Sequence, residues 1–191
     1  NPTIQIVGLS ATVSNSGEIA EWLDATLVQS DFRPVPLRRG IAIDRNIEWE
    51  DGGNSGIRLS GVEGIATDNL PEQCIVFVGT RKAAEAQTRN LSRLIGKKLN
   101  SEDVKKLKSY ADKIKQGADE VTSVDSNLSK LITKGVAYHH AGLTNRHRLI
   151  IESAFRDRTL KALCATPTLA VGVNLPAKRV IIRDLSRWES S

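Results

Sequence analysis

Short runs rich in Val and Ile alternate along this chain with longer amphipathic segments, and this alternation limits the possible fold more than any other feature. The pattern is typical of an α/β domain with a mainly parallel sheet, and we expect it to be doubly wound, with helices on both faces. Strands are predicted at residues 4–9, 35–43, 74–79, 135–139, 161–165 and 179–182. Helices are predicted at residues 17–26, 82–95, 145–155 and directly after Pro167.

Two regions interrupt this alternation. Residues 45–49 and 56–59 flank a turn rich in Gly and Asx residues, which predicts a small hairpin appended to the sheet. Residues 101–133 are charged and have apolar positions at helical spacing, which predicts an insertion of one or two surface helices. Pro34 and Pro36 fix an extended backbone, so we expect a domain boundary near Phe32, between residues 1–32 and residues 33–191.

The composition fits one soluble domain, or one domain with part of a neighbour. The chain has 191 residues, of which 40% are hydrophobic and 26% charged, with no apolar stretch near the ~20 residues of a membrane helix. The first residues have neither a Met nor a signal-peptide layout, which predicts a cytoplasmic location and a piece of a longer polypeptide. Cys74 and Cys164 lie in apolar runs and are expected to be buried thiols. The net charge of +5 favours a polyanionic partner.

Small polar or basic residues follow several of the predicted strands. Ser10 and Thr12 follow the first strand, Thr80 and Arg81 follow residues 74–79, and Gly142 lies in the loop after residues 135–139. Loops at the carboxyl ends of parallel strands meet at one edge of a sheet, where α/β proteins bind ligands. Each loop taken alone fits an ordinary capped turn equally well, whereas the series in order favours a binding edge.

The loop after the predicted strand at residues 161–165 is the most informative. Thr166 and Thr168 offer hydroxyl groups, Gly172 allows close approach of a ligand to the backbone, and Asn174 can bind a ribose or an amide edge. Such a loop can bind a sugar-phosphate backbone without reading bases. By contrast, His139 and His140 should point to opposite faces of a strand, and no third ligand has zinc-like spacing, so no metal site is expected.

Taken together, these segments resemble the motifs of superfamily two helicases. Residues 9–12 resemble motif III, residues 76–81 motif IV and residues 165–176 motif V. Residues 139–143, followed by Arg148 and Phe155, are similar to the Ski-type branch. Trp22 and Leu23, with residues 33–37, narrow the resemblance to the archaeal DNA repair helicases related to the helicase half of polymerase theta.

The resemblance implies that residues 33–191 form a second RecA-like domain, preceded by the last part of the first. In this family, ATP binds between two RecA-like domains, single-stranded DNA crosses both, and hydrolysis drives movement in the 3′ to 5′ direction. The implied roles are coupling for Ser10 and Thr12, DNA contact for Thr80, Arg81, Gly142, Thr166 and Thr168, ATP contact for Gly172 and Asn174, and a structural or DNA role for Arg148.

The resemblance also implies partners and cofactors. The expected partners are single-stranded or forked DNA, the remaining helicase domains of the same chain, and repair or replication proteins. No association with a membrane is expected. ATP and Mg²⁺ are expected only in the full-length parent, because the phosphate-binding lysine loop, the Asp-Glu motif and the arginine-rich motif VI do not occur in these residues. The chain alone is therefore expected to be catalytically inactive. Thr144 and Asn145 replace the Leu and Pro of many relatives, so that turn should differ locally.

Three alternatives stay open. The chain could be a non-catalytic RecA-like module that binds a protein or RNA, or part of an RNA helicase of the same branch. A complete small nucleotide-binding enzyme is disfavoured, because Gly8 stands alone where such an enzyme needs a glycine-rich loop.

Overall fold

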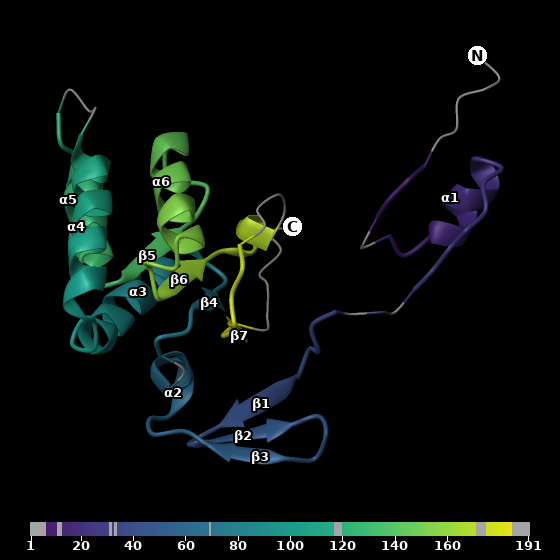
Figure 1. Ribbon diagram of the computed structural model, residues 1–191, viewed down its shortest axis with the longest axis horizontal. Helices are drawn as coiled ribbons and strands as arrows, with labels where there is room; N and C mark the ends of the chain where they lie inside the picture. Colours follow the sequence, from purple (N-terminus) through teal and green to yellow (C-terminus); the bar gives the residue numbers. More distant parts are fainter. Residues whose placement is uncertain are drawn as a thin grey trace. The chain divides into compact units, whose positions relative to one another are not determined.

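The computed structural model describes residues 7–10, 13–30, 32, 34–68, 70–116, 120–170 and 175–184. The chain divides into two compact units, residues 1–38 and residues 39–191 (Figure 1). No helix among the described residues is long and apolar enough to cross a membrane.

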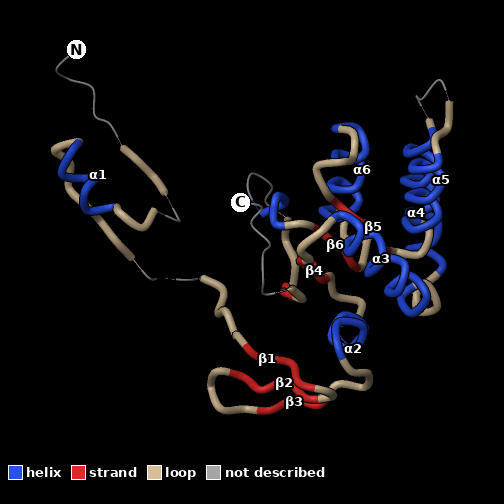
Figure 2. Tube along the Cα trace, turned by 180° about the vertical axis from the view of Figure 1, so that it is seen from behind, coloured by secondary structure: helices blue, strands red, loops and turns tan. Residues whose placement is uncertain are grey.

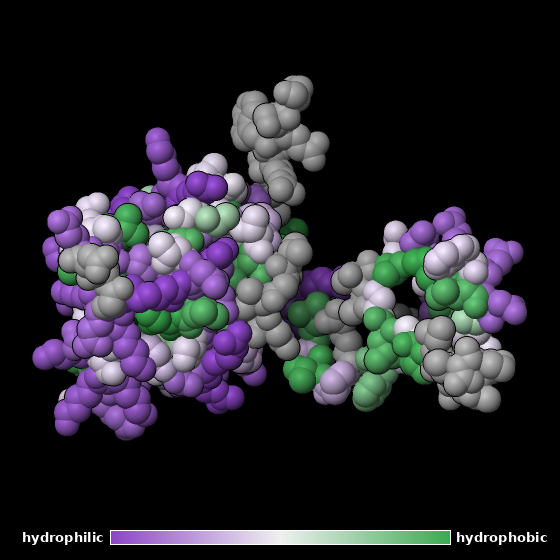
Figure 3. All heavy atoms as spheres, turned by 90° about the horizontal axis from the view of Figure 1, so that it is seen from above, coloured by the Kyte–Doolittle hydropathy of each residue, from purple (hydrophilic) through white to green (hydrophobic). Residues whose placement is uncertain are grey.

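Among its described residues, the smaller unit contains the helix α1 (Ser16–Trp22). It is shorter than the predicted helix at residues 17–26, because Asp24 adopts a left-handed conformation with φ of 49°, which ends the helix. Residues 7–9 are not in a strand, and the rest of the strand predicted at residues 4–9 lies outside the described residues. Large apolar side chains stay exposed on this unit (Figure 3), including Leu9 at 93% and Trp22 at 82%. Exposed apolar surface of this kind is typical of an interaction surface.

The larger unit is built around a four-stranded parallel sheet with the order β5-β6-β4-β7 (Figure 1). Its strands are β4 (Cys74–Phe77), β5 (Val136–His139), β6 (Ala162–Ala165) and β7 (Arg179–Ile182). All four were predicted, because each strand reads as a short apolar run, and β4, β5 and β6 are largely buried on both faces.

Helices cover both faces of this sheet (Figure 2). α3 (Arg81–Ile95) and α5 (Ser123–Ile132) pack on one face, and α6 (Asn145–Arg156) packs on the other. Successive residues of β5 lie near helices on opposite faces of the sheet. Tyr138 lies near Glu85 of α3: burial raises the pKa of the Tyr138 hydroxyl, and the charge of Glu85 raises it further. The next residue, His139, pairs with Glu152 of α6. The predicted α/β class with helices on both faces is confirmed.

A separate antiparallel sheet precedes the main sheet in the chain. It contains β1 (Gly40–Ile43), β2 (Asn46–Trp49) and β3 (Asn54–Gly56) in that order. The prediction of a main-sheet strand at residues 35–43 was wrong in two respects. The strand begins only at Gly40, since Pro36 lacks an N–H group for ladder pairing, and it belongs to this separate sheet. The strand predicted at residues 56–59 was also wrong, because the turn closes within residues 50–53 and pairing ends at Gly56.

The helix α2 (Gly61–Asp68) was not predicted from the sequence. The predicted insertion at residues 101–133 forms two helices, α4 (Ser101–Lys115) and α5, but they are not surface additions. Leu107 and Ile114 of α4 are fully buried, and α4 packs on both α5 and α6. The guanidinium of Arg146 also donates hydrogen bonds to the carbonyls of Lys113 and Ile114 at the end of α4.

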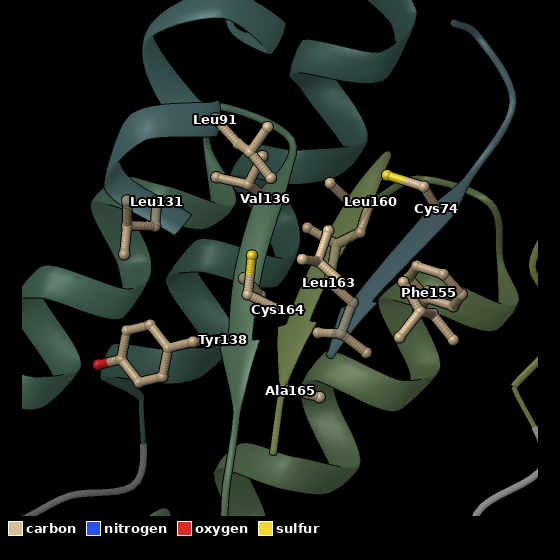
Figure 4. Close-up of a cluster of buried hydrophobic side chains, with 14 of the residues drawn as sticks. Cys74, Leu91, Leu131, Val136, Tyr138, Phe155, Leu160, Leu163, Cys164 and Ala165 are labelled. Atoms are coloured by element: carbon tan, nitrogen blue, oxygen red, sulfur yellow. The ribbon is translucent and has the colours of Figure 1, made fainter. Parts of the chain in front are cut away.

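The core of the larger unit lies between the main sheet and its helices (Figure 4). Leu91 of α3, Phe155 of α6 and Leu163 of β6 are fully buried there. Cys74 and Cys164 lie in the same core as free thiols, which confirms the prediction of buried thiols. Burial raises the pKa of each thiol from an ordinary value of 9.0 to about 12.

We expect both thiols to resist alkylation in the folded chain. The thiolate is the reactive form, and a pKa raised to about 12 lowers the thiolate fraction at pH 8 by about a thousandfold. Iodoacetamide labelling at pH 8, followed by mass spectrometry, should therefore be at least about a hundredfold slower than in urea. Rapid labelling of either cysteine in the folded chain would contradict this.

Candidate functional site

The loops that follow the four parallel strands meet at one edge of the main sheet. The N–H of Val78, after β4, donates to the carbonyl of Ala165 at the end of β6 at 2.9 Å. The N–H of Thr166, after β6, donates to the carbonyl of His139 at the end of β5 at 3.3 Å. The N–H of Arg183, after β7, donates to the carbonyl of Phe77 at 3.0 Å. The edge at which candidate residues were expected therefore exists.

Thr80 and Arg81 lie where the β4 loop enters α3. Thr80 is the N-cap of α3, and its hydroxyl oxygen accepts the N–H of Ala83 at 3.1 Å. Arg81 and Lys82 occupy the first turn, which holds no acidic residue. Cations at a helix N-terminus oppose the helix dipole, so helix stability does not explain them. Their exposed positive charge fits an anionic ligand.

Gly142 lies in a tight turn after β5. The N–H of Leu143 donates to the carbonyl of His140 at 3.0 Å, and the N–H of Gly142 donates to Nδ1 of His140 at 3.1 Å. A Cβ atom at Gly142 would lie 3.3 Å from Nη1 of Arg81. The structure therefore brings Gly142 and Arg81 together, although they follow different strands.

Thr166 and Thr168 lie after β6. Their hydroxyl oxygens are 2.9 Å apart, and Thr166 is buried while Thr168 is exposed. The short helix expected after Pro167 is the 3₁₀ turn η1 (Pro167–Ala170), and the N–H of Leu169 closes it on the carbonyl of Thr166 at 3.0 Å. Gly172 and Asn174 lie outside the described residues.

An ion pair after β7 was not predicted. Arg183 binds Asp184 with both Nε and Nη2, at 2.7 and 2.9 Å. Hydrogen bonding from Arg183 lowers the pKa of Asp184, and Oδ2 of Asp184 accepts the N–H of Gly79 at 2.8 Å. The Gly79 N–H, which precedes Thr80 and Arg81 in the same loop, is therefore already occupied. No local pattern signals this contact, because 105 positions separate the two residues.

Within the larger unit, one other candidate is not brought into this group by a side-chain hydrogen bond or ion pair among the described residues. Arg148 is half-buried on α6. Burial is the main cause of the lowered pKa of His139, and the charge of Arg148 adds to it. Ser10 is exposed in the smaller unit, and Thr12 lies outside the described residues.

The two adjacent histidines face different helices. His139 lies 3.1 Å from Glu152 of α6, whereas His140 lies 3.6 Å from Glu85 of α3. Within the described part of the chain, no group of three or more His, Cys, Asp or Glu residues could hold a metal ion.

Comparison with known proteins finds sequences similar to this chain. Residues 113–191 match the family described as the helicase conserved C-terminal domain. The ATP-dependent DNA helicase Hel308 of Thermoplasma acidophilum is 44% identical over 191 residues, which is 100% of this chain and 26% of that protein. Over its whole length, this chain resembles Hel308. The Hel308 proteins of Thermoplasma volcanium and Methanocella arvoryzae are 40% and 39% identical, over 98% and 99% of this chain and 26% of each relative.

The resemblance to archaeal DNA helicases expected from the motifs is thereby confirmed. The chain spans about a quarter of the length of the Hel308 proteins that it matches. The matched helicase domain begins at Lys113, in the last turn of α4, and includes the loops after β5 and β6.

Proposed function

We propose that this chain is part of an ATP-dependent DNA helicase that moves 3′ to 5′ along single-stranded DNA and acts in DNA repair or at stalled forks. The observation that carries the proposal is the approach of Arg81 to Gly142 at the edge where Thr166 and Thr168 also lie, in a chain that resembles Hel308 throughout. Within the parent, residues 1–32 would end the first RecA-like domain, and residues 33–191 would belong to the second.

The chemistry of the edge fits a phosphate backbone rather than bases. Arg81 supplies an exposed positive charge, Thr80 and Thr168 supply exposed hydroxyl groups, and Gly142 has no side chain to hold a strand away. Stacking platforms are scarce, because only 4% of the residues are aromatic. We therefore infer sequence-independent binding of single-stranded or forked DNA.

We assign nucleotide chemistry to the complete helicase. ATP would bind between this part and another RecA-like domain of the parent, with Gly172 and Asn174 beside the nucleotide and Ser10 and Thr12 coupling it to DNA. The described residues do not fit a Mg²⁺ site, so we place the metal ligands on the other domain. We further propose a cytoplasmic location, with repair or replication proteins as additional partners.

The test is fluorescence anisotropy of a labelled single-stranded DNA oligonucleotide with this chain across a salt series. We expect weak binding that falls steeply with salt, because phosphate contacts release counterions. The double variant Thr166→Ala, Arg81→Ala should bind about tenfold more weakly and reduce the salt slope by about one. The matched control Thr133→Ala, Arg93→Ala removes the same groups, with Arg93 at the other end of α3, and should bind like the unchanged chain.

Equal losses in both double variants would mean that the net charge acts diffusely, and would contradict the proposed track. No binding at low salt would favour a protein-interaction module instead. Preference for an RNA oligonucleotide of the same sequence would favour an RNA helicase.

A further inference from the structure

The imidazole of His140 has one well-defined role in the turn after β5. The ring is 6% exposed and stacks on Tyr138, with centroids 5.3 Å apart and planes at 8°. Its Nδ1 lies 3.1 Å from the N–H of Gly142. An imidazole nitrogen accepts a hydrogen bond only when it carries no proton, so the neutral ring holds its proton on Nε2. Tyr138 fixes the plane of the ring, and the ring fixes the Gly142 turn.

The same ring lies against the side chain of Arg81. A Cβ atom at Gly142 would lie 3.1 and 3.2 Å from Nδ1 and Cε1 of His140, and 3.3 Å from Nη1 of Arg81. Both side chains therefore approach the Cα of Gly142. The side chain of Arg81 is exposed and, among the described residues, forms neither a hydrogen bond nor an ion pair, so its guanidinium is free to bind an anion beside the Gly142 turn.

Glu85 is the carboxylate best placed to neutralise Arg81, because it lies four residues later on α3. Instead, Oε1 of Glu85 lies 3.6 Å from Nε2 of His140, and Oε2 lies 3.7 Å from Nη1 of Arg89. The 3.6 Å between Nε2 and Oε1 is too long for a hydrogen bond, and Nε2 is buried without a hydrogen-bond partner among the described residues. In the described part of the chain, the carboxylate of Glu85 pairs with Arg89 and forms no ion pair with Arg81.

We propose that His140 is a positioning residue for a backbone phosphate: its Nδ1 holds the Gly142 turn against Arg81, whose side chain stays available to an anion. This inference rests on the proposed function, since it names the residue that assembles the same DNA-binding edge. Burial lowers the pKa of His140, and the charge of Arg81 adds to this while Glu85 opposes it. The ring therefore stays neutral near pH 7, as an accepting Nδ1 requires.

Two substitutions separate this role from simple packing. His140→Asn places a side-chain oxygen where Nδ1 lies but removes the ring, whereas His140→Phe keeps the stacking on Tyr138 but has no acceptor. We expect His140→Asn to bind the DNA oligonucleotide within about twofold of the unchanged chain. We expect His140→Phe to bind at least about fivefold more weakly, and the Gly142 amide to exchange with solvent about tenfold faster in that variant by NMR, because its hydrogen bond is lost.

The reverse order, with His140→Phe unchanged and His140→Asn impaired, would show that the ring only fills space and would overturn the inference. His140→Ala also lacks the acceptor, and replaces His140→Phe if that variant unfolds. If Arg81→Ala weakens DNA binding while His140→Phe and His140→Ala do not, the inference fails and the proposed function stands. If Arg81→Ala has no effect on DNA binding, the proposed function fails, and the inference about His140 fails with it.

Discussion

Gly64→Ala is expected to lower the free energy of unfolding of this chain by at least about 3 kcal/mol. A Cβ atom at Gly64 would lie 1.6 Å from the carbonyl oxygen and 2.5 Å from the carbonyl carbon of Leu59. Both atoms belong to the backbone, so no side-chain rotation can relieve the overlap. Helix propensity alone predicts the opposite sign, because Ala is favoured over Gly within a helix by about 1 kcal/mol.

The consequences should extend beyond α2, because this helix contacts both β7 of the main sheet and α3. The guanidinium of Arg179, at the start of β7, donates to the carbonyl of Ile65 at 2.9 Å. Glu63 accepts a hydrogen bond from Gln87 of α3 at 2.9 Å. Displacing α2 to make room for a methyl group would strain both contacts.

Urea unfolding followed by far-UV circular dichroism measures this effect. The matched control is Gly56→Ala, whose new Cβ would meet only the Arg45 carbonyl at 4.0 Å, an ordinary contact. That control should change the free energy of unfolding by less than about 0.5 kcal/mol. A more stable Gly64→Ala chain would show that the Leu59 carbonyl moves away at little cost, and would refute the argument.

The parts of this fold that are predictable from sequence are those fixed by local pattern. Residues 74–77 and 162–165 read as buried strands, because four successive apolar or small residues can be buried on both faces of a parallel sheet. Once those strands are parallel, their carboxyl ends share an edge. The grouping of Thr80, Gly142 and Thr166 therefore follows from the order of elements alone.

The missed features depend on contacts between distant residues. α2 contains Gly61 and Gly64, which disfavour a helix, and tertiary packing overrides that preference. The bond between Asp184 and the Gly79 N–H joins two loops that no periodicity relates. The place of Arg81 beside Gly142 likewise depends on the ring of His140, whose orientation follows from stacking on Tyr138.

A second large effect is expected at Asp125, which joins the first turns of α5 and α6. One carboxylate oxygen lies 2.6 Å from Nε2 of His147 on α6. The other accepts the N–H and the hydroxyl of Thr122, at 2.8 and 2.7 Å, and completes a capping box at the start of α5. Asp125 and His147 are both buried, at 2% and 5% exposed. A single carboxylate thus completes the cap of α5 and binds a side chain in the first turn of α6.

Asp125→Ala should lower the free energy of unfolding by about 3 kcal/mol in urea titrations at pH 7. Loss of a helix cap costs about 1 kcal/mol, and a buried polar group left without its partner adds a larger penalty. Asp125→Asn keeps an acceptor for Thr122, so its free energy of unfolding should lie between those of the unchanged chain and of Asp125→Ala. The control Asp112→Ala removes an exposed carboxylate of α4 and should have an effect below about 0.5 kcal/mol.

The effect of Asp125→Ala should depend on pH in a defined direction. Hydrogen bonds from Thr122 lower the pKa of Asp125 below its ordinary value of 3.8, with His147 adding to the lowering. The unfolded chain therefore binds a proton at Asp125 at a higher pH than the folded chain does. The stability that the carboxylate contributes is complete above the unfolded pKa and is lost as the pH falls through the folded one. The unfolding free energies of the unchanged chain and of Asp125→Ala should accordingly converge below about pH 4. A constant difference between the two from pH 7 to pH 3 would mean that the charge of Asp125 contributes nothing to stability.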